Sequence, residues 1–310
     1  MAKQPIRIGA RGSKLSRVQA ESVRAAIARS LGGDEAAVVI TFTTTGDRIQ
    51  DRTLAEIGGK GLFTKEIEEA LADGRIDCAV HSLKDMPAID PPGLIIAASP
   101  AREDPRDAFV SAGFESIAAL PVGARLGTAS LRRRAQALNR RPDLQILAVR
   151  GNVDTRLAKL ARGEADALVL AAAGLERLGM ADQIRAFVDP RRSPPAPGQG
   201  ALAIQCRAED ADAAWLEGLR HAPTMLATAA ERGALAALDG SCRTAVGAYA
   251  EVTDGHLRLH VEALSPDGRM SFSGAEEIEA AGGEAAARDL GLTLGAAIAV
   301  HAGGALSGPT

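Results

Sequence analysis

Residues 5–46 read PIRIGARGSKLSRVQAESVRAAIARSLGGDEAAVVITFTTTG, and this stretch decides the fold. Its first residues, 5–11, have the pattern of a short strand, and Ser13 is placed to cap a helix. Residues 15–31 have the apolar periodicity of a helix that ends at a glycine pair. A β-branched segment, 37–46, then predicts a second strand. A strand, a helix and another strand in this order predict a parallel sheet covered by helices.

The same alternation continues through the first hundred residues. A glycine-rich loop at 56–61 precedes helical periodicity at 63–71, and apolar strands are expected at 76–83 and 93–99. The polar, proline-containing stretch SPAREDPRD, residues 99–107, predicts a linker at the end of this first α/β domain.

A second α/β unit follows the linker. We expect strands at 107–112, 124–128, 144–149 and 166–171, with helices at 130–139 and 153–161. A second linker, SPPAPGQG at 193–200, precedes one more strand, ALAIQCR. Two linkers around one unit predict that the chain leaves the first domain, builds the second and returns. Such a double crossover makes a hinge with a cleft between two lobes.

The last ninety residues predict a small α+β domain. A helix at 224–240 is followed by strand patterns at 242–252, 257–264 and 270–278, and the turns between them contain Asp-Gly. We expect a three-stranded antiparallel meander closed by a helix after Glu284. The predicted domains are residues 1–99 with 200–219, residues 100–199, and residues 220–310.

Composition restricts the class of protein. The chain has 310 residues, of which 46% are apolar and 24% charged, and its net charge is −3, values typical of a folded globular protein. The absence of an 18-residue apolar run and of a secretion signal predicts a cytoplasmic protein without a membrane partner. Three cysteines without metal-ligand spacing predict reduced thiols and no metal. No long exposed apolar helix stripe is evident, so we expect a monomer.

Positive charge is concentrated between Arg125 and Lys159. This window holds nine basic residues and two acidic ones. Its segment 127–130 follows a strand and opens a helix, where anions are favoured. Strand-end geometry can gather Arg132, Arg133, Arg150 and Arg156 at one edge. We favour anion binding for these four over a solvated basic face, whereas the two readings are equal for Arg134, Arg140 and Arg141.

The anion is expected to be a small molecule. Nucleic acid is the rival ligand for a basic surface, but the basic window has no aromatic residue for base stacking. The whole chain has only six Phe, one Tyr and one Trp. A molecule with several carboxylates or phosphates fits better than DNA or RNA.

Two turns of the first domain carry candidate site residues. Arg11 and Ser13 follow the first strand, although Ser13 is also an ordinary N-cap. In VHSLKDMP, Lys84 and Asp85 lie at the carboxyl end of a strand, where α/β proteins place their sites. Asp85 could stabilise a positive charge formed in a reaction, or it could form an exposed ion pair with Lys84. We interpret His81 as a packed histidine and residues 58–61 as a mobile loop.

The three cysteines differ in context. Cys78 and Cys206 lie within apolar strand patterns and are expected to be buried and inert. Cys242 lies in the turn DGSCR beside Arg243, where a cation can lower the pKa of a thiol. It is a candidate nucleophile or attachment point, and a quiet loop thiol is the alternative.

Nine motifs together resemble the porphobilinogen deaminase (hydroxymethylbilane synthase) family. In chain order they are ARGSKLS, TTTGD, GGKGLF, VHSLKDMP, GTASLRRRAQ, VRGNVDTRL, AAAGLERLG, PAPGQGAL and LDGSCRTAVGAYA. The resemblance covers nearly the whole chain. It implies two lobes like those of periplasmic binding proteins and a third domain that carries a dipyrromethane cofactor by a thioether on Cys242.

The resemblance also implies an activity and its residues. Four porphobilinogen molecules are deaminated and joined head to tail on the dipyrromethane primer, and water releases a linear tetrapyrrole, in porphyrin and heme biosynthesis. Asp85 corresponds to the catalytic carboxylate. The residues implied to bind the cofactor are Cys242, Lys84, Asp85, Ser130, Arg132, Arg133, Arg156, Asp47 and Thr128. Those implied to bind substrate are Arg11, Ser13, Arg150, Arg156, Arg177 and Gln199.

Two other functions remain open from the residues alone. A two-lobed protein with converging arginines could be a non-catalytic receptor for small anions, but the turn cysteine and the third domain disfavour this reading. A nucleic-acid-binding protein would use the basic helix face and would show strongly salt-dependent binding.

Overall fold

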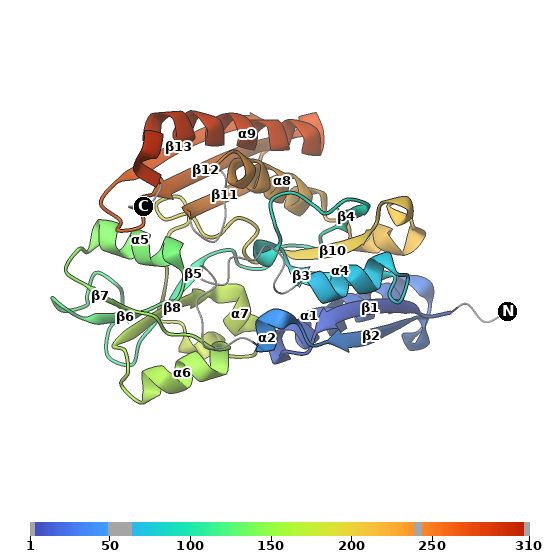
Figure 1. The fold of residues 1–310 in the computed structure, drawn as a ribbon, viewed down its shortest axis with the longest axis horizontal. Helices are drawn as coiled ribbons and strands as arrows, with labels where there is room; N and C mark the ends of the chain where they lie inside the picture. Colours follow the sequence, from blue (N-terminus) through green and yellow to red (C-terminus); the bar gives the residue numbers. More distant parts are fainter. Residues whose placement is uncertain (1–3, 49–63, 239–243, 307–310) are drawn as a thin grey trace. The chain divides into compact units, whose positions relative to one another are not determined.

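The structure is a computed structural model that describes residues 4–48, 64–238 and 244–306 (Figure 1). The chain separates into two compact units. Unit 1 contains Met1–Glu103 and Ala201–Met225, and unit 2 contains Asp104–Gly200 and Leu226–Thr310. The three predicted domain boundaries, and the predicted cleft between lobes, stay predictions.

Unit 1 is built on a five-stranded sheet of order β2-β1-β3-β10-β4. Strand β1 pairs in parallel with β2 and β3, which confirms the parallel alternation predicted for this region. Strand β10 lies between β3 and β4 and confirms that the chain returns to the first sheet, but it runs antiparallel to both neighbours. The sheet is therefore mixed. Its strands are β1 (Ile6–Arg11), β2 (Ala37–Phe42), β3 (Cys78–Ser82), β4 (Leu94–Ala98) and β10 (Leu202–Arg207).

Helix α1 (Lys14–Leu31) covers this sheet as predicted. The Ser13 hydroxyl accepts a hydrogen bond from the Ser16 amide, and Gly32 ends the helix with a φ of 90°. The helix buries Val23 and Ile27 in the core that also contains β1, β3 and β10. Burial of this apolar face supplies most of the helix's stability.

The second strand is shorter than predicted. Strand β2 ends at Phe42, and a short helix, α2 (Thr45–Arg48), begins three residues later. The amide and hydroxyl of Thr45 both donate to Glu66 Oε1, at 2.7 and 2.5 Å. Glu66 belongs to α4 (Lys65–Ala72), so a side chain distant in sequence turns the chain out of the strand.

Unit 2 contains a second mixed sheet, of order β7-β6-β8-β5-β9. Strand β6 pairs in parallel with β7 and β8, whereas β5 pairs antiparallel with β8 and β9. Helix α6 occupies the predicted residues, and α7 and β9 were not predicted. The elements are β5 (Asp107–Val110), β6 (Arg125–Gly127), α5 (Leu131–Arg140), β7 (Gln145–Leu147), α6 (Val153–Ala161), β8 (Ala167–Ala171), α7 (Ala172–Arg177) and β9 (Ala186–Phe187).

The antiparallel meander predicted at the C-terminal end is confirmed. Strands β11 (Ala245–Thr253), β12 (His256–Leu264) and β13 (Ser271–Glu279) pair in sequence order. The first turn contains Asp254 and Gly255 at φ values of 51° and 78°, the left-handed backbone that a tight hairpin requires. Thus the Asp-Gly signal identified this hairpin correctly.

Helices α8 (Ala222–Ala237) and α9 (Gly283–Ala302) form a common core with the meander (Figure 1). Alternate residues of β12, among them Leu257, Leu259 and Val261, are buried in this core. The helices pack closely, because a Cβ atom on Gly291 would collide with the carbonyl oxygen of Ala230. This close approach explains the glycine in the middle of α9.

The C-terminal helical stretch is strongly apolar. Residues Ala280–Leu306 contain an 18-residue window with a mean hydropathy of 1.3, long and apolar enough to cross a membrane, of which 28% is buried. In the structure, Ala287, Leu294 and Ile298 of this stretch are buried against the meander, and a core helix meets the same criteria. The predicted absence of a membrane partner stays a prediction.

Candidate carboxylate-binding and catalytic site

The predicted residues of the first domain lie where two strands of unit 1 end. Arg11 is the last residue of β1, and its amide donates to the Ser16 hydroxyl at 3.1 Å. Ser13 caps α1 and is half-buried. The turn between strand and helix is thereby fixed, and substrate binding by Arg11 and Ser13 stays a prediction.

Lys84 and Asp85 lie on a single turn of 3₁₀ helix, Leu83–Asp85, directly after β3. The Leu83 amide donates to the carbonyl of Ala201 at 3.0 Å, and the Met86 amide donates to the carbonyl of Leu83 at 3.0 Å. Leu83 and Met86 are buried, whereas Asp85 is exposed. Within the described part of the chain, the Asp85 carboxylate has no hydrogen-bond partner. An anchored turn therefore presents a carboxylate to solvent.

His81 is buried in β3, as predicted for a packed histidine. Only 5% of its surface is exposed. Burial is the main reason that the pKa of this imidazole is lowered to about 4. A hydrogen bond with Gln205 opposes this shift, and the charge of Arg11 adds to it. His81 is thus neutral at physiological pH.

The clearest cluster of predicted residues lies inside unit 2. Arg132 and Arg133, in the first turn of α5, both bind the carboxylate of Asp107, the first residue of β5. The closest distances are 2.7 Å from Arg132 Nη1 and 2.8 Å from Arg133 Nη2. All three side chains are at most 8% exposed. Two buried cations therefore share one buried anion.

The arginines determine the ionisation of Asp107. Burial raises the pKa of the Asp107 carboxyl, but the charges and hydrogen bonds of Arg132 and Arg133 outweigh burial and hold this pKa far below its usual range. Burial also lowers the pKa of the Arg132 guanidinium, against the opposing charge of Asp107. Arginine remains protonated under all physiological conditions, so the three groups carry one net positive charge.

The guanidinium of Arg132 is only partly satisfied by the described residues. Nη1 donates to Asp107 Oδ2 at 2.7 Å, to Gln136 Oε1 at 2.8 Å and to the carbonyl of Pro194 at 3.2 Å. Nη2 makes one long bond, 3.3 Å, to Asp107 Oδ1. Nε is buried and has no hydrogen-bond partner among the described residues. A buried, unsatisfied donor in a net positive cluster makes Arg132 a candidate for binding an anion.

Arg133 is engaged more completely. Its Nε and Nη2 donate to Asp107 Oδ1, at 3.0 and 2.8 Å, and its Nη1 donates to the carbonyl of Val169 at 3.1 Å. Nη2 also donates to Gln199 Oε1 at 3.2 Å. Gln199 is 1% exposed, and its amide nitrogen donates to Asp107 and to the carbonyl of Pro105. Both residues thus belong to the buried network, and substrate binding by Gln199 stays a prediction.

Much of the positive excess predicted between Arg125 and Lys159 is compensated. Arg125 pairs with Asp166 at 2.7 Å, and Arg140 pairs with Glu262 at 3.2 Å. These acids lie outside the sequence window in which the charges were counted. Arg141 pairs with Asp143 at 2.6 Å and donates to carbonyls of residues 117–121. A count of charges along the chain therefore overestimates the positive charge at the surface.

The remaining candidates in unit 2 surround the strand ends. Ser130 caps α5 by accepting a hydrogen bond from the Arg133 amide, and its own amide donates to Thr128 Oγ1 at 3.2 Å. Arg156 Nε donates to the carbonyl of Gly151 at 2.8 Å. Arg177 Nη2 donates to the carbonyl of Gly200 at 2.9 Å. Arg150, Arg156 and Arg177 are half-buried.

The cysteines expected to be inert are buried. Cys78 and Cys206 are free thiols with no exposed surface. Burial raises the pKa of both, that of Cys206 to about 11, so neither is a thiolate near neutral pH. Cys242, the side chain of Asp47 and the predicted loop at 58–61 lie outside the described residues.

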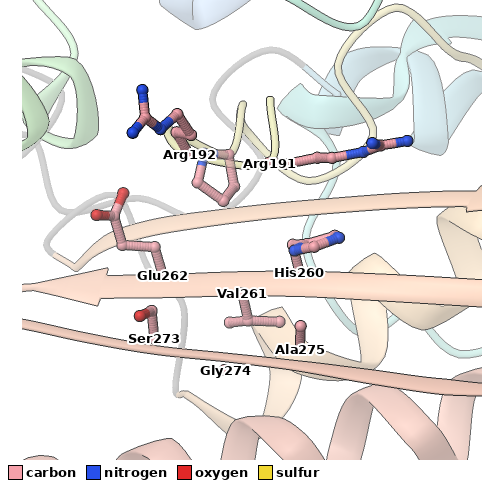
Figure 2. A pocket seen from close by; sticks show the side chains of 9 residues that line it. Arg191, Arg192, His260, Val261, Glu262, Ser273, Gly274 and Ala275 are labelled. Carbon is pink, nitrogen blue, oxygen red and sulfur yellow. The ribbon is translucent and has the colours of Figure 1, made fainter. Parts of the chain in front are cut away.

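Sequence reasoning missed three residues of the buried network, Asp107, Gln136 and Glu262. Gln136 Nε2 donates to Glu262 Oε2 at 2.8 Å and to the carbonyl of Pro194 at 2.9 Å. Glu262 lies on β12, and the alternation of side chains along this strand places it on the face opposite to the buried leucines. Its carboxylate also borders a cavity of about 250 Å³ that Arg191, Arg192 and His260 help to line (Figure 2). That cavity contains none of the predicted site residues.

Comparisons with known proteins identify the family. A family model described as "Porphobilinogen deaminase, dipyromethane cofactor binding domain" matches residues 6–214, and one described as "Porphobilinogen deaminase, C-terminal domain" matches residues 225–299. The chain belongs to the porphobilinogen deaminase family. Porphobilinogen deaminases from Caulobacter vibrioides and Phenylobacterium zucineum are 61% and 59% identical to it. Each match covers 99% of this chain and 99% of the relative.

More distant matches include both family members and other proteins. The porphobilinogen deaminase from Ralstonia nicotianae is 52% identical over 87% of this chain and 81% of its own length. Among solved structures, a putative methionine-binding lipoprotein from Bacillus subtilis matches with 14% identity and a TM-score of 0.43. The match covers 71% of this chain and 90% of that protein.

Proposed function

We propose that this chain is a hydroxymethylbilane synthase that joins four porphobilinogen molecules on a dipyrromethane primer held by Cys242. Membership of the porphobilinogen deaminase family supports the activity, and the description of the matched domain supports the cofactor. The finer assignments that follow concern individual residues. We further propose that the enzyme is a cytoplasmic monomer without a nucleic-acid or membrane partner.

The buried Nε of Arg132 is the observation that carries the cofactor proposal. Each pyrrole of the primer has two carboxylates, and a carboxylate requires donors and positive charge. The cluster of Arg132, Arg133 and Asp107 supplies one net positive charge, and the Nε–Nη2 edge of Arg132 has the bidentate geometry that matches a carboxylate. The residues present therefore fit this group.

Further polar groups belong to the proposed set of binding residues. The hydroxyls of Thr128 and Ser130 lie at the N-terminus of this helix, where the backbone favours negative charge. Arg156 and Lys84 supply further cations, and Asp47 belongs to the same proposed set. Arg11, Ser13, Arg150 and Arg177 bind the carboxylates of the incoming porphobilinogen. When bound, the dipyrromethane supplies the carbon nucleophile on which the chain is extended.

Asp85 is the proposed catalytic residue. Loss of ammonia from porphobilinogen leaves a cationic methylene-pyrrole, and a carboxylate stabilises such a cation and accepts a hydrogen bond from the pyrrole N–H. Asp85 is suited to this role because the Leu83–Asp85 turn is anchored while the carboxylate itself is exposed. The side chain can therefore meet substrate without first breaking a hydrogen bond to any of the described residues.

The intact mass of the denatured protein tests this proposal. Wild type should carry an excess mass of two pyrrole units, and Cys242→Ser should have only its sequence mass. Cys206→Ala is the matched control, because Cys206 is buried and its thiol is protonated, and it should keep the adduct. If wild type fails to gain mass even after incubation with porphobilinogen, the proposal is wrong and a non-catalytic anion-binding function is favoured.

A further inference from the structure

We propose that Gln136 and Glu262 are positioning residues that determine which edge of the Arg132 guanidinium faces the cofactor. This inference rests on the proposed function, in which Arg132 binds a cofactor carboxylate. Neither residue would contact the cofactor. Both would act through Arg132, and Glu262 would do so from the C-terminal meander.

The orientation of the Gln136 amide is fixed by its neighbours. Its nitrogen faces two groups that only accept hydrogen bonds, the Glu262 carboxylate at 2.8 Å and the Pro194 carbonyl at 2.9 Å. Its oxygen faces Arg132 Nη1, which only donates, at 2.8 Å. A rotated amide would place donor against donor and acceptor against acceptor. Glu262 therefore ensures that Gln136 presents an acceptor to Arg132.

This acceptor selects an edge of Arg132. A guanidinium can bind a carboxylate through Nη1 and Nη2 or through Nε and Nη2. Arg133 approaches Asp107 through Nε and Nη2, at 3.0 and 2.8 Å. Arg132 approaches the same carboxylate through Nη1 and Nη2, at 2.7 and 3.3 Å. Two further acceptors lie at Nη1, Gln136 Oε1 at 2.8 Å and the more distant Pro194 carbonyl at 3.2 Å. They favour this second arrangement, which leaves Nε without a partner among the described residues.

Glu262 is itself held in place. Its side chain is 7% exposed and accepts hydrogen bonds from Arg140 at 3.2 Å and from the Ser271 hydroxyl at 3.1 Å, besides that from Gln136. Figure 2 shows Glu262 on the same side of β12 as His260, with Arg191 and Arg192 carried by the segment across from it. Because Glu262 is multiply bonded, it is a rigid reference for the Gln136 amide.

A double-mutant cycle separates positioning from simple anchoring of α5. The variants are Gln136→Leu, Arg132→Lys and the two combined, and the readouts are kcat, KM, melting temperature and the fraction of protein that carries the primer by intact mass. We expect Gln136→Leu to lower kcat about tenfold and to reduce primer loading, with a smaller change in KM. In the Arg132→Lys background it should have no further effect on either quantity.

The matched control is Glu251→Gln. Glu251 lies on the neighbouring strand β11 and pairs with Arg191 at 2.7 Å. The control therefore removes an ion pair of a meander residue, and this pair does not include Arg132. It should leave kcat and primer loading unchanged. If Gln136→Leu does not fold, Glu262→Gln replaces it. This variant keeps the shape of residue 262 but no longer requires a donor from Gln136, so primer loading should fall in the wild-type background and not in the Arg132→Lys background.

The outcomes distinguish this inference from the proposed function. If Arg132→Lys loads and turns over like wild type, Arg132 does not bind the cofactor, and both proposals for it are wrong. If Arg132→Lys is impaired but Gln136→Leu is normal, only the positioning inference is wrong. An equal effect of Gln136→Leu in both backgrounds, or an effect on melting temperature alone, also overturns it.

Discussion

Arg132 and Arg133 bind one carboxylate, that of Asp107, through different edges of their guanidinium groups. The side chains of adjacent helix residues point about 100° apart. Two such side chains can bind the same carboxylate only when it lies between the directions in which they point. The start of β5 provides such a position. Because the two arginines share one anion, one net positive charge remains in a buried site. The proposed ligand, a carboxylate of the cofactor, would compensate this charge.

Replacing Asp107 should destabilise the protein severely. Asp107→Asn leaves two buried guanidinium groups without a counter-ion, and removal of one partner from a buried pair costs about 3–5 kcal/mol in the free energy of unfolding. Urea denaturation followed by circular dichroism measures this loss. Asp143→Asn is the control, since the Arg141–Asp143 pair is more exposed, and it should change the midpoint little. Equal midpoints for the two variants would contradict the account.

The lowered pKa of Asp107 also predicts that the free energy of unfolding decreases in acid. Because the folded state holds this carboxyl ionised, its contribution is complete above the unfolded pKa, about 4, and is lost as pH falls towards the folded value. Asp107→Asn should remove this part of the decline. The free energies of unfolding of both proteins at pH 5 and at pH 3 provide the test, and parallel declines would show that Asp107 contributes nothing to it.

Helices could be predicted from the sequence where their apolar periodicity and capping residues lie within or next to the helix itself. Helix α6 occupies the expected residues, and Ser13 and Gly32 cap α1 as expected. The direction of β10 could not be predicted, because alternation of apolar residues is the same in parallel and antiparallel strands. The early end of β2 depends on Glu66, which is distant in sequence.

The candidate site could be predicted only in part, for a similar reason. The sequence motif and the position at a strand end identified Arg132 and Arg133 as candidates. Their partner Asp107 is the first residue of an apolar strand and precedes Arg132 by 25 residues. Glu262 alternates with buried leucines on β12, a pattern typical of a solvated face. Its burial results from contacts with Gln136 and Ser271. The pattern of residues along β12 carries no information about these contacts.

Asp85→Asn should abolish most turnover without unfolding the protein. The substitution removes the negative charge that we propose stabilises the substrate cation, but it keeps the shape of an exposed side chain. We expect kcat to fall by a factor of about 10² to 10³, as for loss of an electrostatic contact in a transition state. The melting temperature and the covalent primer should be retained. Near-normal kcat would show that Asp85 does not have this role, and Asp73→Asn, at another exposed carboxylate of unit 1, is the control.

His81 should make the stability of unit 1 depend on pH between about 4 and 6.5. Its folded pKa, about 4, is below the ordinary value because the ring is buried, so the unfolded chain binds a proton first as pH falls. Stability should therefore be complete above pH 6.5 and should decline by up to about 1.4 kcal/mol per pH unit below it. His81→Asn should show a shallower decline in urea titrations at pH 7, 5.5 and 4.5. Identical slopes for the two proteins would mean that His81 titrates normally in the folded state.

Gly291 should tolerate no side chain at the crossing of α8 and α9. A Cβ atom there would collide with the carbonyl oxygen of Ala230, and this contact involves backbone on both helices, so a rotamer change cannot relieve it. Overpacking of this kind costs about 1–3 kcal/mol, and we expect Gly291→Ala to lower the melting temperature accordingly. Ala297→Ser, at an exposed position of the same helix, should leave the melting temperature within a degree or so of wild type. If Gly291→Ala melts like wild type or higher, the gain in helix propensity outweighs the collision, and the helices do not approach as closely as described.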